Sequence, residues 1–179
     1  MHTLIIVVHP GLQGGSRVNR RLTELMLTAK GVTVHDLYAC YPEGNIDVKR
    51  EQELLLQHKR VVFQFPLWWY SAPPLLKHWL DEVLTFGWAY GPGGDRLHGQ
   101  EWRVAVTAGS PAASYGGEGY NKYTLEEMLR PFEATANLVG ARWLPLFAVC
   151  DALQLSEGEL TAAALQYGEE VLADIAGSY

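Results

Sequence analysis

The chain has 179 residues, of which 48% are hydrophobic and 19% charged. These proportions are ordinary for one globular domain, so we expect a single domain over residues 1–179. The net charge of −6 comes with no long basic run. This argues against nucleic acid or an anionic membrane surface as the main partner and favours small-molecule ligands.

The two cysteines, Cys40 and Cys150, lie far apart in the sequence. They form neither a Cys-x-x-Cys pair nor a zinc-ligand spacing, which predicts no metal site and fits a reducing compartment. The first apolar run, Leu4 to Val8, is interrupted at once by His9 and Pro10. A run of this length is too short for a signal peptide or a membrane span, so we expect a cytoplasmic protein.

Short apolar runs alternate with amphipathic stretches along the chain, which is typical of βα units around a parallel sheet. Near-continuous runs such as LIIVV suit strands that helices cover on both faces. Apolar residues at helical spacing predict helices between the strands. The expected strands are Thr3–Val8, Val32–Leu37, Arg60–Phe65, Arg103–Thr107 and Arg142–Val149, and the expected helical stripes run over Val18–Ala29, Leu76–Leu84 and Leu160–Ile175.

Thr124 and Glu127 predict a capping box that opens a further helix. Pro131 is expected to kink that helix, and Gly140 lies where a C-terminal cap would fall. Five strands with helices between them predict an α/β fold of the flavodoxin-like kind, a doubly wound five-stranded parallel sheet with strand order 2-1-3-4-5. In such folds ligands bind beyond the carboxyl ends of the strands, which directs attention to the loops there.

The first of these loops, HPGLQGGSRVN, leads from a buried strand through several glycines to Ser16. Ser16 is predicted to be the N-cap of a helix, whose free N–H groups and dipole would favour a phosphate. Asn19 could add a donor and Arg17 a nearby charge. The glycine spacing matches neither G-x-G-x-x-G nor a Walker sequence, so an ordinary capped βα turn is an equally good interpretation of this loop alone.

The second loop places Trp68, Trp69 and Tyr70 in a row just past a strand end, before prolines that open a helix. Three consecutive large aromatic residues cannot all face one core. At least one is expected at the surface, where a flat ring system could stack on it. A dimer contact or an aromatic cap over the core would explain the same residues.

Several segments together resemble a known family. They are His9-Pro10 followed by S-x-x-N, the segment FQFPLWWYSAPPLLKHWLDEVLTFGWAYG over 63–91, YPEGNID over 41–47, LRPFEATANLVG over 129–140, and a T-x-G turn after a strand. They resemble the flavodoxin-like NAD(P)H:quinone oxidoreductases. The resemblance is to the small bacterial branch that includes the YwrO-type reductases and the ancillary proteins of glutathione-gated potassium-efflux systems.

The resemblance implies a flavin site with specific residues. His9, Ser16, Arg17, Val18 and Asn19 match the loop for the flavin phosphate, and Pro66, Leu67, Trp68, Trp69 and Tyr70 match the segment along the isoalloxazine ring. Thr107, Ala108, Gly109 and Ser110 match a T-T-G-G loop whose backbone amides face the N1 and O2 edge of the ring. Ala108 and Ser110 depart from that pattern, and Ser110 loses the conformational freedom of glycine.

The implied reaction has two half-reactions, in which NAD(P)H gives a hydride to the flavin and a quinone or related acceptor then takes the electrons in the same slot. Larger relatives carry a tyrosine and a histidine in the loop after the T-x-G turn. Tyr115 falls at the tyrosine position and Asn121 at the histidine position. We expect Tyr115 to hydrogen-bond the reduced flavin or the acceptor, and Asn121 to give a neutral hydrogen bond at most, since an amide cannot supply a proton. Alternatively, Tyr115 and Tyr120 only pack a glycine-rich lid.

The resemblance also implies a cofactor and an oligomeric state, and two alternative functions stay open. FMN is expected as the cofactor rather than FAD, because the chain has no extended C-terminal region to hold an adenosine. A homodimer is expected, with Trp88, Tyr90 and the adjoining GPGG segment as apolar surface for the second copy. The alternatives are a regulatory ancillary subunit that associates peripherally with a potassium-efflux membrane protein, and a flavodoxin-like carrier of single electrons.

Overall fold

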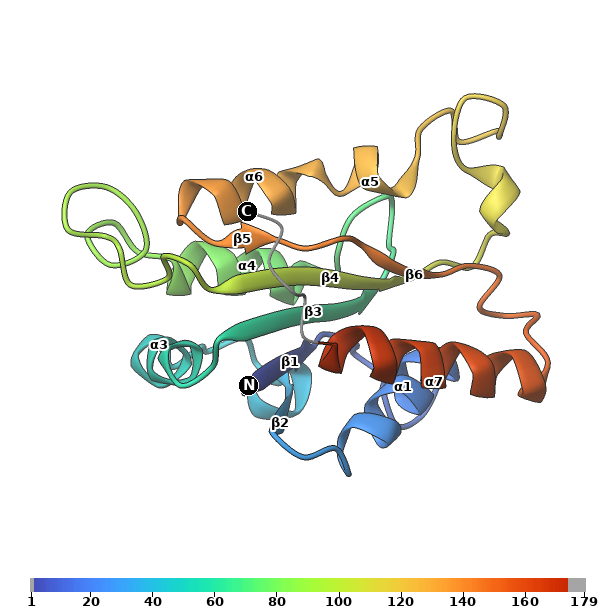
Figure 1. The fold of residues 1–179 in the computed structure, drawn as a ribbon, viewed down its shortest axis with the longest axis horizontal. Helices are drawn as coiled ribbons and strands as arrows, with labels where there is room; N and C mark the ends of the chain where they lie inside the picture. The colour runs from blue at the N-terminus through green and yellow to red at the C-terminus, as the bar shows by residue number, and fades with distance from the viewer. Residues whose placement is uncertain (1, 174–179) are drawn as a thin grey trace.

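A parallel sheet forms the centre of the structure, a computed structural model that describes residues 2–173 (Figure 1). The strands run in the order β2-β1-β3-β4-β5, and a short β6 also pairs with β4. This is the flavodoxin-like order predicted from the sequence. The strand bounds are β1 (Thr3–Val7), β2 (Val32–Asp36), β3 (Arg60–Pro66), β4 (Glu101–Thr107), β5 (Arg142–Trp143) and β6 (Phe147–Val149).

The last strand was predicted as one piece over Arg142–Val149, and this is wrong. The structure divides it into β5 and β6, which pair with the two ends of β4. Pro145 lies in the gap between them. A proline has no N–H to give to the ladder, so the strand is interrupted at the place where its pairing would need that donor.

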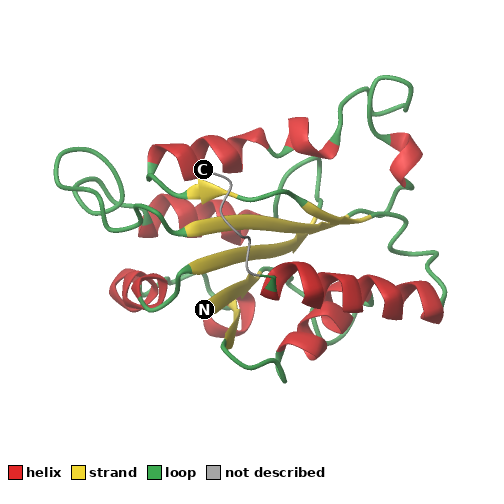
Figure 2. Ribbon diagram, in the orientation of Figure 1, coloured by secondary structure: helices red, strands yellow, loops and turns green. Residues whose placement is uncertain are grey.

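Helices cover both faces of the sheet (Figure 2). The bounds are α1 (Val18–Met26), α2 (Leu37–Cys40), α3 (Val48–Leu56), α4 (Pro74–Val83), α5 (Leu125–Met128), α6 (Arg130–Leu138) and α7 (Glu157–Leu172), with a 3-10 turn η1 (Ala112–Ser114). On one face α1 and α7 pack on Ile5, Val7 and Val62. On the other face α3, α4 and α6 pack on the alternate residues of the same strands. No helix within residues 2–173 is both long and apolar enough to cross a membrane.

The predicted helix signals have mixed outcomes. The Thr124 and Glu127 capping box is present, and Gly140 adopts a positive φ of 71° near the end of α6. The kink expected at Pro131 is a break, because α5 ends at Met128 and Pro131 lies in the first turn of α6. The first helix stops at Met26 rather than Ala29. Ile175, the last residue of the predicted C-terminal stripe, lies outside the described residues.

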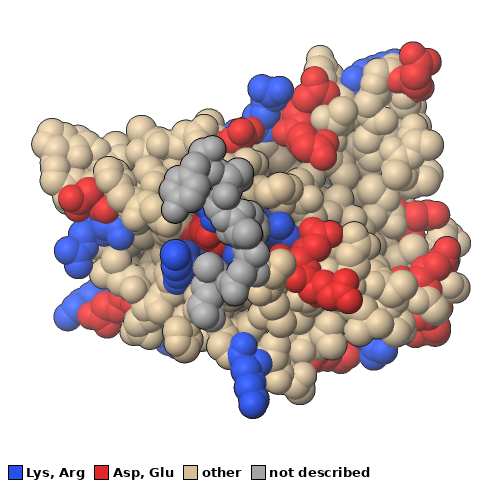
Figure 3. Space-filling model, in the orientation of Figure 1, with Lys and Arg blue, Asp and Glu red and all other residues tan. Residues whose placement is uncertain are grey.

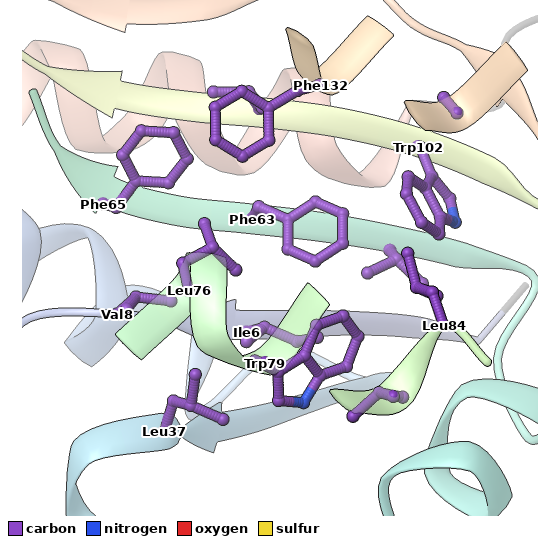
Figure 4. Packing of buried hydrophobic residues seen from close by; sticks show 14 of the residues in the cluster. Ile6, Val8, Leu37, Phe63, Phe65, Leu76, Trp79, Leu84, Trp102 and Phe132 are labelled. Carbon is purple, nitrogen blue, oxygen red and sulfur yellow. The ribbon is translucent and has the colours of Figure 1, made fainter. Parts of the chain in front are cut away.

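Aromatic residues fill the core between β3, β4 and α4 (Figure 4). The ring of Phe63 lies edge-on to Trp79, with 5.8 Å between ring centroids, and edge-on to Trp102 at 5.1 Å. Edge-to-face pairs of this kind stabilise beyond the area they bury, by about 0.5–1.5 kcal/mol each. This packing fixes α4 against β3 and so fixes the loop that joins them.

A buried carboxylate connects α3 to its neighbours. Glu51 on α3 is 0% exposed and accepts hydrogen bonds from Tyr41 Oη at 2.6 Å, Trp79 Nε1 at 2.8 Å and His35 Nε2 at 3.0 Å. Burial alone would raise the pKa of the Glu51 carboxyl, but these hydrogen bonds outweigh it and hold that pKa below its usual value. The cluster ties β2, α3 and α4 together.

Candidate active site

Two neighbouring cavities lie where β1, β3 and β4 end. The first, of about 360 Å³, borders the start of α1, and we call it the α1 cavity; the second, of about 220 Å³, is walled by aromatic residues, and we call it the aromatic cavity. Leu67 and Gly109 line both cavities. The strand ends point to the right in Figure 1, and the same side of the molecule in Figure 3 shows a broad uncharged area between acidic groups.

The α1 cavity is lined by all five of the residues predicted to bind a phosphate. Its lining is His9, Gly15, Ser16, Arg17, Val18, Asn19, Pro66, Leu67, Trp68, Thr107, Gly109, Ala152 and Leu153. The backbone N–H groups of residues 16–19 donate to no acceptor within the described residues. A helix start with unpaired N–H groups facing a cavity is a ready site for an anion, because the helix dipole adds to the hydrogen bonds.

The structure corrects the predicted role of Ser16 as the N-cap. The N-cap of α1 is Arg17, and within residues 2–173 no side chain accepts a hydrogen bond from the N–H groups of the first turn. Arg17 has helical backbone angles, φ −80° and ψ −52°, and within the described residues the Ser16 hydroxyl accepts no hydrogen bond from the N–H groups that follow it. The Ser16 hydroxyl therefore does not compete with a bound ligand for the N–H groups and lines the cavity with them.

Arg17 and Asn19 line the cavity but already have partners in the protein. The Arg17 guanidinium forms an ion pair with Glu157 at 2.7 Å and also donates to the carbonyl oxygen of Leu155. Asn19 is 2% exposed, and its Nδ2 donates to Thr107 Oγ1 at 2.8 Å. Both side chains are therefore already engaged within the protein, which the sequence did not predict.

His9 closes the side of the α1 cavity next to β1. Its Nδ1 accepts a hydrogen bond from the N–H of Gly11 at 3.0 Å, so the proton of the neutral ring is on Nε2. Burial lowers the pKa of His9, against an opposing effect of Asp36. The ring is therefore neutral at pH 7 and offers an N–H donor rather than a charge.

The aromatic row after β3 forms a strained turn. Trp68 and Ser71 exchange backbone hydrogen bonds at 2.8 and 3.0 Å, and the two residues between them, Trp69 and Tyr70, have positive φ of 48° and 62°. Turns with two positive φ values usually contain asparagine and glycine. Such backbone strain costs about 1–3 kcal/mol per residue and gathers at functional sites. Trp69 is 94% exposed at the tip of this turn.

The turn after β4 joins the two cavities. Thr107 and Gly109 line the α1 cavity, and Gly109 and Ser110 line the aromatic cavity. Ala108 lines neither, because it is 2% exposed and its N–H donates to the carbonyl of Val149. The N–H groups of Gly109 and Ser110 donate to no acceptor within residues 2–173. In the turn where a row of backbone amides was expected to face the flavin, these two N–H groups are the ones free to bind a ligand.

The aromatic cavity brings together Tyr115 and Asn121, the two residues for which the sequence suggested a catalytic role. Its lining is Leu67, Trp69, Tyr70, Gly109, Ser110, Tyr115, Tyr120 and Asn121. Burial raises the pKa of Tyr115, so its hydroxyl is a protonated donor at neutral pH. Asn121 Nδ2 is buried without a hydrogen-bond partner within the described residues. The Tyr120 hydroxyl lies 2.6 Å from the Ser110 hydroxyl.

Sequence reasoning missed a fourth loop at this edge, residues 150–156. Ala152 and Leu153 line the α1 cavity, and Asp151 has a positive φ of 56°. The loop is held by hydrogen bonds from Asp151 N to Ser110 O at 2.9 Å and from Ala152 N to Ala108 O at 3.0 Å. The signal was available, since this loop follows the last predicted strand and must emerge at the same edge of a parallel sheet.

A family model described as a flavodoxin-like fold matches residues 1–171. The chain belongs to this flavodoxin-like family. Among its curated relatives, the uncharacterized NAD(P)H oxidoreductase YdeQ of Bacillus subtilis is 50% identical over 96% of this chain and 86% of the relative. The glutathione-regulated potassium-efflux system ancillary protein KefG of Escherichia coli is 44% identical over 93% of this chain and 90% of the relative.

Solved structures of the family superpose over nearly the whole chain. General stress protein 14 of Treponema denticola, solved in complex with FMN, has a TM-score of 0.89 and 41% identity, over 96% of this chain and 98% of that one. An NADPH-quinone reductase of P. pentosaceus has a TM-score of 0.87 and 34% identity, over 99% of this chain and 100% of that one. A structure described as a thermophilic tryptophan halogenase from Streptomycin violaceusniger has a TM-score of 0.94 and 47% identity, over 96% of this chain and 99% of that one. Such different descriptions on one fold mean that function must be argued from the site.

Proposed function

We propose that the chain is an FMN-dependent NAD(P)H:quinone oxidoreductase, that is, an NAD(P)H dehydrogenase acting on quinones or related aromatic acceptors. The observation that carries this proposal is the junction of two cavities at Leu67 and Gly109, one lined by unpaired helix N–H groups and one by aromatic rings. An elongated ligand with a phosphate at one end and a flat ring at the other fits that pair of environments. The FMN complex of a relative 41% identical supports the same ligand.

The residues present fit FMN. The N–H groups of residues 16–19 and the Ser16 hydroxyl would hold the phosphate, and Leu67, Trp68 and Thr107 would contact the ring. FMN, when bound, supplies hydride acceptance from NAD(P)H and delivery of two electrons to the acceptor. FMN is favoured over FAD because the α1 cavity offers donors for one terminal phosphate.

The protein's own contribution is to orient, to exclude water and to place donors. The unpaired N–H groups of Gly109 and Ser110 would stabilise negative charge on a ring that lies across the junction of the cavities. Tyr70 and Trp69 wall the aromatic cavity and would stack on a flat acceptor. Tyr115 would donate a hydrogen bond to the acceptor, and Asn121 would give a neutral one, so the product takes its protons from solvent.

The experiment is an anaerobic titration of the purified, FMN-loaded protein with NADPH and with NADH, followed by addition of a benzoquinone. Bleaching of the flavin absorbance by the nucleotide and its recovery on adding the quinone are expected. Released flavin that runs as FMN in chromatography after denaturation identifies the cofactor. A protein that binds no flavin, or whose flavin is not bleached by either nucleotide, would contradict the proposal.

A second candidate function is regulatory. The identity of 44% to KefG favours an ancillary subunit that associates with a potassium-efflux membrane protein and has only secondary reductase activity. Co-purification with such a membrane protein, together with slow turnover of free quinones, would favour this function. Rapid turnover with no such association would favour the enzyme.

We also propose a homodimer. The expected surface differs in detail from the sequence prediction, because Trp88 and Tyr90 are partly buried against the core while Phe86 is 68% exposed beside them. Phe86 packs edge-on to Tyr90 with 5.7 Å between ring centroids. An apolar groove of about 460 Å³ between α4 and α6 continues from Tyr90. A second copy would cover these apolar side chains.

A further inference from the structure

Gln64 is a fully buried amide between the sheet and the α1 helix. It lies on β3, is 0% exposed, and its register neighbours are Val7 on β1 and Ala105 on β4. Val7, Ala105 and Val62 all belong to the apolar cluster between the sheet and the α1 and α7 helices. A polar side chain in this position needs a hydrogen-bonding reason, because burying an unpaired amide costs about 1–3 kcal/mol.

The amide nitrogen of Gln64 donates hydrogen bonds to acceptors on α1. Nε2 donates to Thr23 Oγ1 at 3.0 Å, to the Asn19 carbonyl oxygen at 3.0 Å and, at 3.4 Å, to Asn19 Oδ1. Asn19 then donates from Nδ2 to Thr107 Oγ1 at 2.8 Å. The contacts form one directed chain from β3 through the first turn of α1 to the end of β4.

The direction of this chain fixes the proton of Thr107. An asparagine amide can be turned two ways, and the Gln64 donor beside it selects the orientation with Oδ1 toward Gln64 and Nδ2 toward Thr107. A threonine hydroxyl has a single proton, and here its oxygen already accepts from Asn19. Thr107 lines the α1 cavity. Its proton is therefore left to donate to a ligand in that cavity.

Stability does not explain the glutamine. Gln64 Oε1 is buried and has no hydrogen-bond partner within the described residues. A buried acceptor without a partner is a cost in free energy, which a methionine of similar volume would avoid. Thr23, at the other end of the same contact, could turn its hydroxyl to a carbonyl of its own helix if Gln64 were replaced.

We propose that Gln64 is a positioning residue for the flavin: through Asn19 it holds the Thr107 hydroxyl as a hydrogen-bond donor toward the ring system. The inference rests on the proposed function, since it takes FMN as the ligand. By this inference Gln64, which lies outside both cavities, contributes to the affinity for the flavin ring. This contribution is separate from the phosphate contacts at Ser16.

The test is a double-mutant cycle on flavin affinity of the apoprotein, measured by fluorescence quenching with riboflavin, which lacks the phosphate, and with FMN. Thr107→Val and Gln64→Met should each weaken binding of both ligands about three- to tenfold, the worth of one net hydrogen bond. If Gln64 acts through Thr107, the double variant should bind as Thr107→Val alone does. Thr23→Val, the matched control, breaks the contact between Gln64 and Thr23 and should leave both affinities unchanged.

The inference would be overturned if the double variant lost flavin affinity by the product of the two single-variant factors. It would also be overturned if Gln64→Met bound flavin as tightly as the parent protein. If Gln64→Met fails to fold, Asn19→Asp tests the same step, because a carboxylate cannot donate to Thr107 and would take its proton instead. Riboflavin affinity should then fall by the factor seen for Thr107→Val, and no fall would refute the chain. A parent protein that binds neither flavin refutes the proposed function itself.

Discussion

The hydroxyl oxygens of Ser110 and Tyr120 lie 2.6 Å apart at the aromatic cavity. Ser110 stands where the family pattern has glycine, so this hydrogen bond ties the loop after η1 to the turn after β4 in a way that glycine could not. The hydrogen bond also lowers the pKa of the exposed Tyr120 hydroxyl. The pair forms part of the wall of the aromatic cavity.

Breaking this pair should loosen the loop that walls the aromatic cavity. Ser110→Gly and Tyr120→Phe are each expected to raise KM for a bulky quinone several-fold with little change in KM for NAD(P)H. Because both variants remove the same contact, the double variant should behave as the single ones do. Steady-state kinetics with a small and a bulky quinone measure this, and additive effects would show that the pair does not act as a unit.

Ser16→Ala should weaken FMN binding by about 1.5–3 kcal/mol, or roughly tenfold to more than a hundredfold, because a hydrogen bond to a charged group is lost. Riboflavin affinity should not change, since riboflavin has no phosphate. Arg17→Ala is the control. Its guanidinium is paired with Glu157, so its removal should change FMN affinity much less. Equal losses of riboflavin and FMN affinity in Ser16→Ala would place the hydroxyl elsewhere than at the phosphate.

Tyr115→Phe should slow the reaction about tenfold, or about 1.4 kcal/mol, if the phenol donates a hydrogen bond in the transition state. Asn121→Ala should do less. Stopped-flow traces over a pH series measure both half-reactions, and no step typical of a histidine is expected. Tyr115→Phe rates that equal the parent rates at every pH would show that Tyr115 only packs the loop.

Relieving the strained turn should stabilise the protein at the expense of acceptor binding. Trp69 has a φ of 48° and its side chain is 94% exposed, so glycine there removes strain with little loss of packing. Trp69→Gly should raise Tm by about 2–4 °C, as a gain of about 1 kcal/mol does in a chain of this size, and should raise KM for the quinone. Phe86→Gly, at an exposed aromatic residue without positive φ, should give no such gain in Tm.

Glu51→Gln should lower the free energy of unfolding at pH 7 by about 3 kcal/mol, because three donors lose a charged acceptor in a buried place. The folded state holds the pKa of Glu51 below the usual 4.5. Its stabilisation is therefore complete above that pH and is lost as the pH falls through the lower, folded-state pKa. Thermal melts from pH 7 down to 3 should show a shallower acid decline of Tm in Glu51→Gln than in the parent. Parallel curves would refute the assignment.

Sequence patterns were sufficient for the sheet order, because the inner strands are mostly apolar and the connections between strands contain helices. They were not sufficient to predict α2 and α3. These helices are held in part by a buried glutamate, which a pattern of apolar residues does not reveal. The glycines and aromatic residues of three loops predicted where the candidate site lies. The partners of Arg17 and Asn19 could not be predicted, because Glu157 and Thr107 are 140 and 88 residues away along the chain.

The interruption of the last strand at Pro145 has a consequence for solubility. β5 and β6 lie at one edge of the sheet, and edge strands with long rows of unpaired N–H and C=O groups invite pairing with other molecules and aggregation. Here the edge consists of a strand of two residues, a gap, and a strand of three residues. A second sheet would find no continuous template on this side. Replacing Pro145 with a β-branched residue would lengthen the edge and favour fibrous association at high protein concentration.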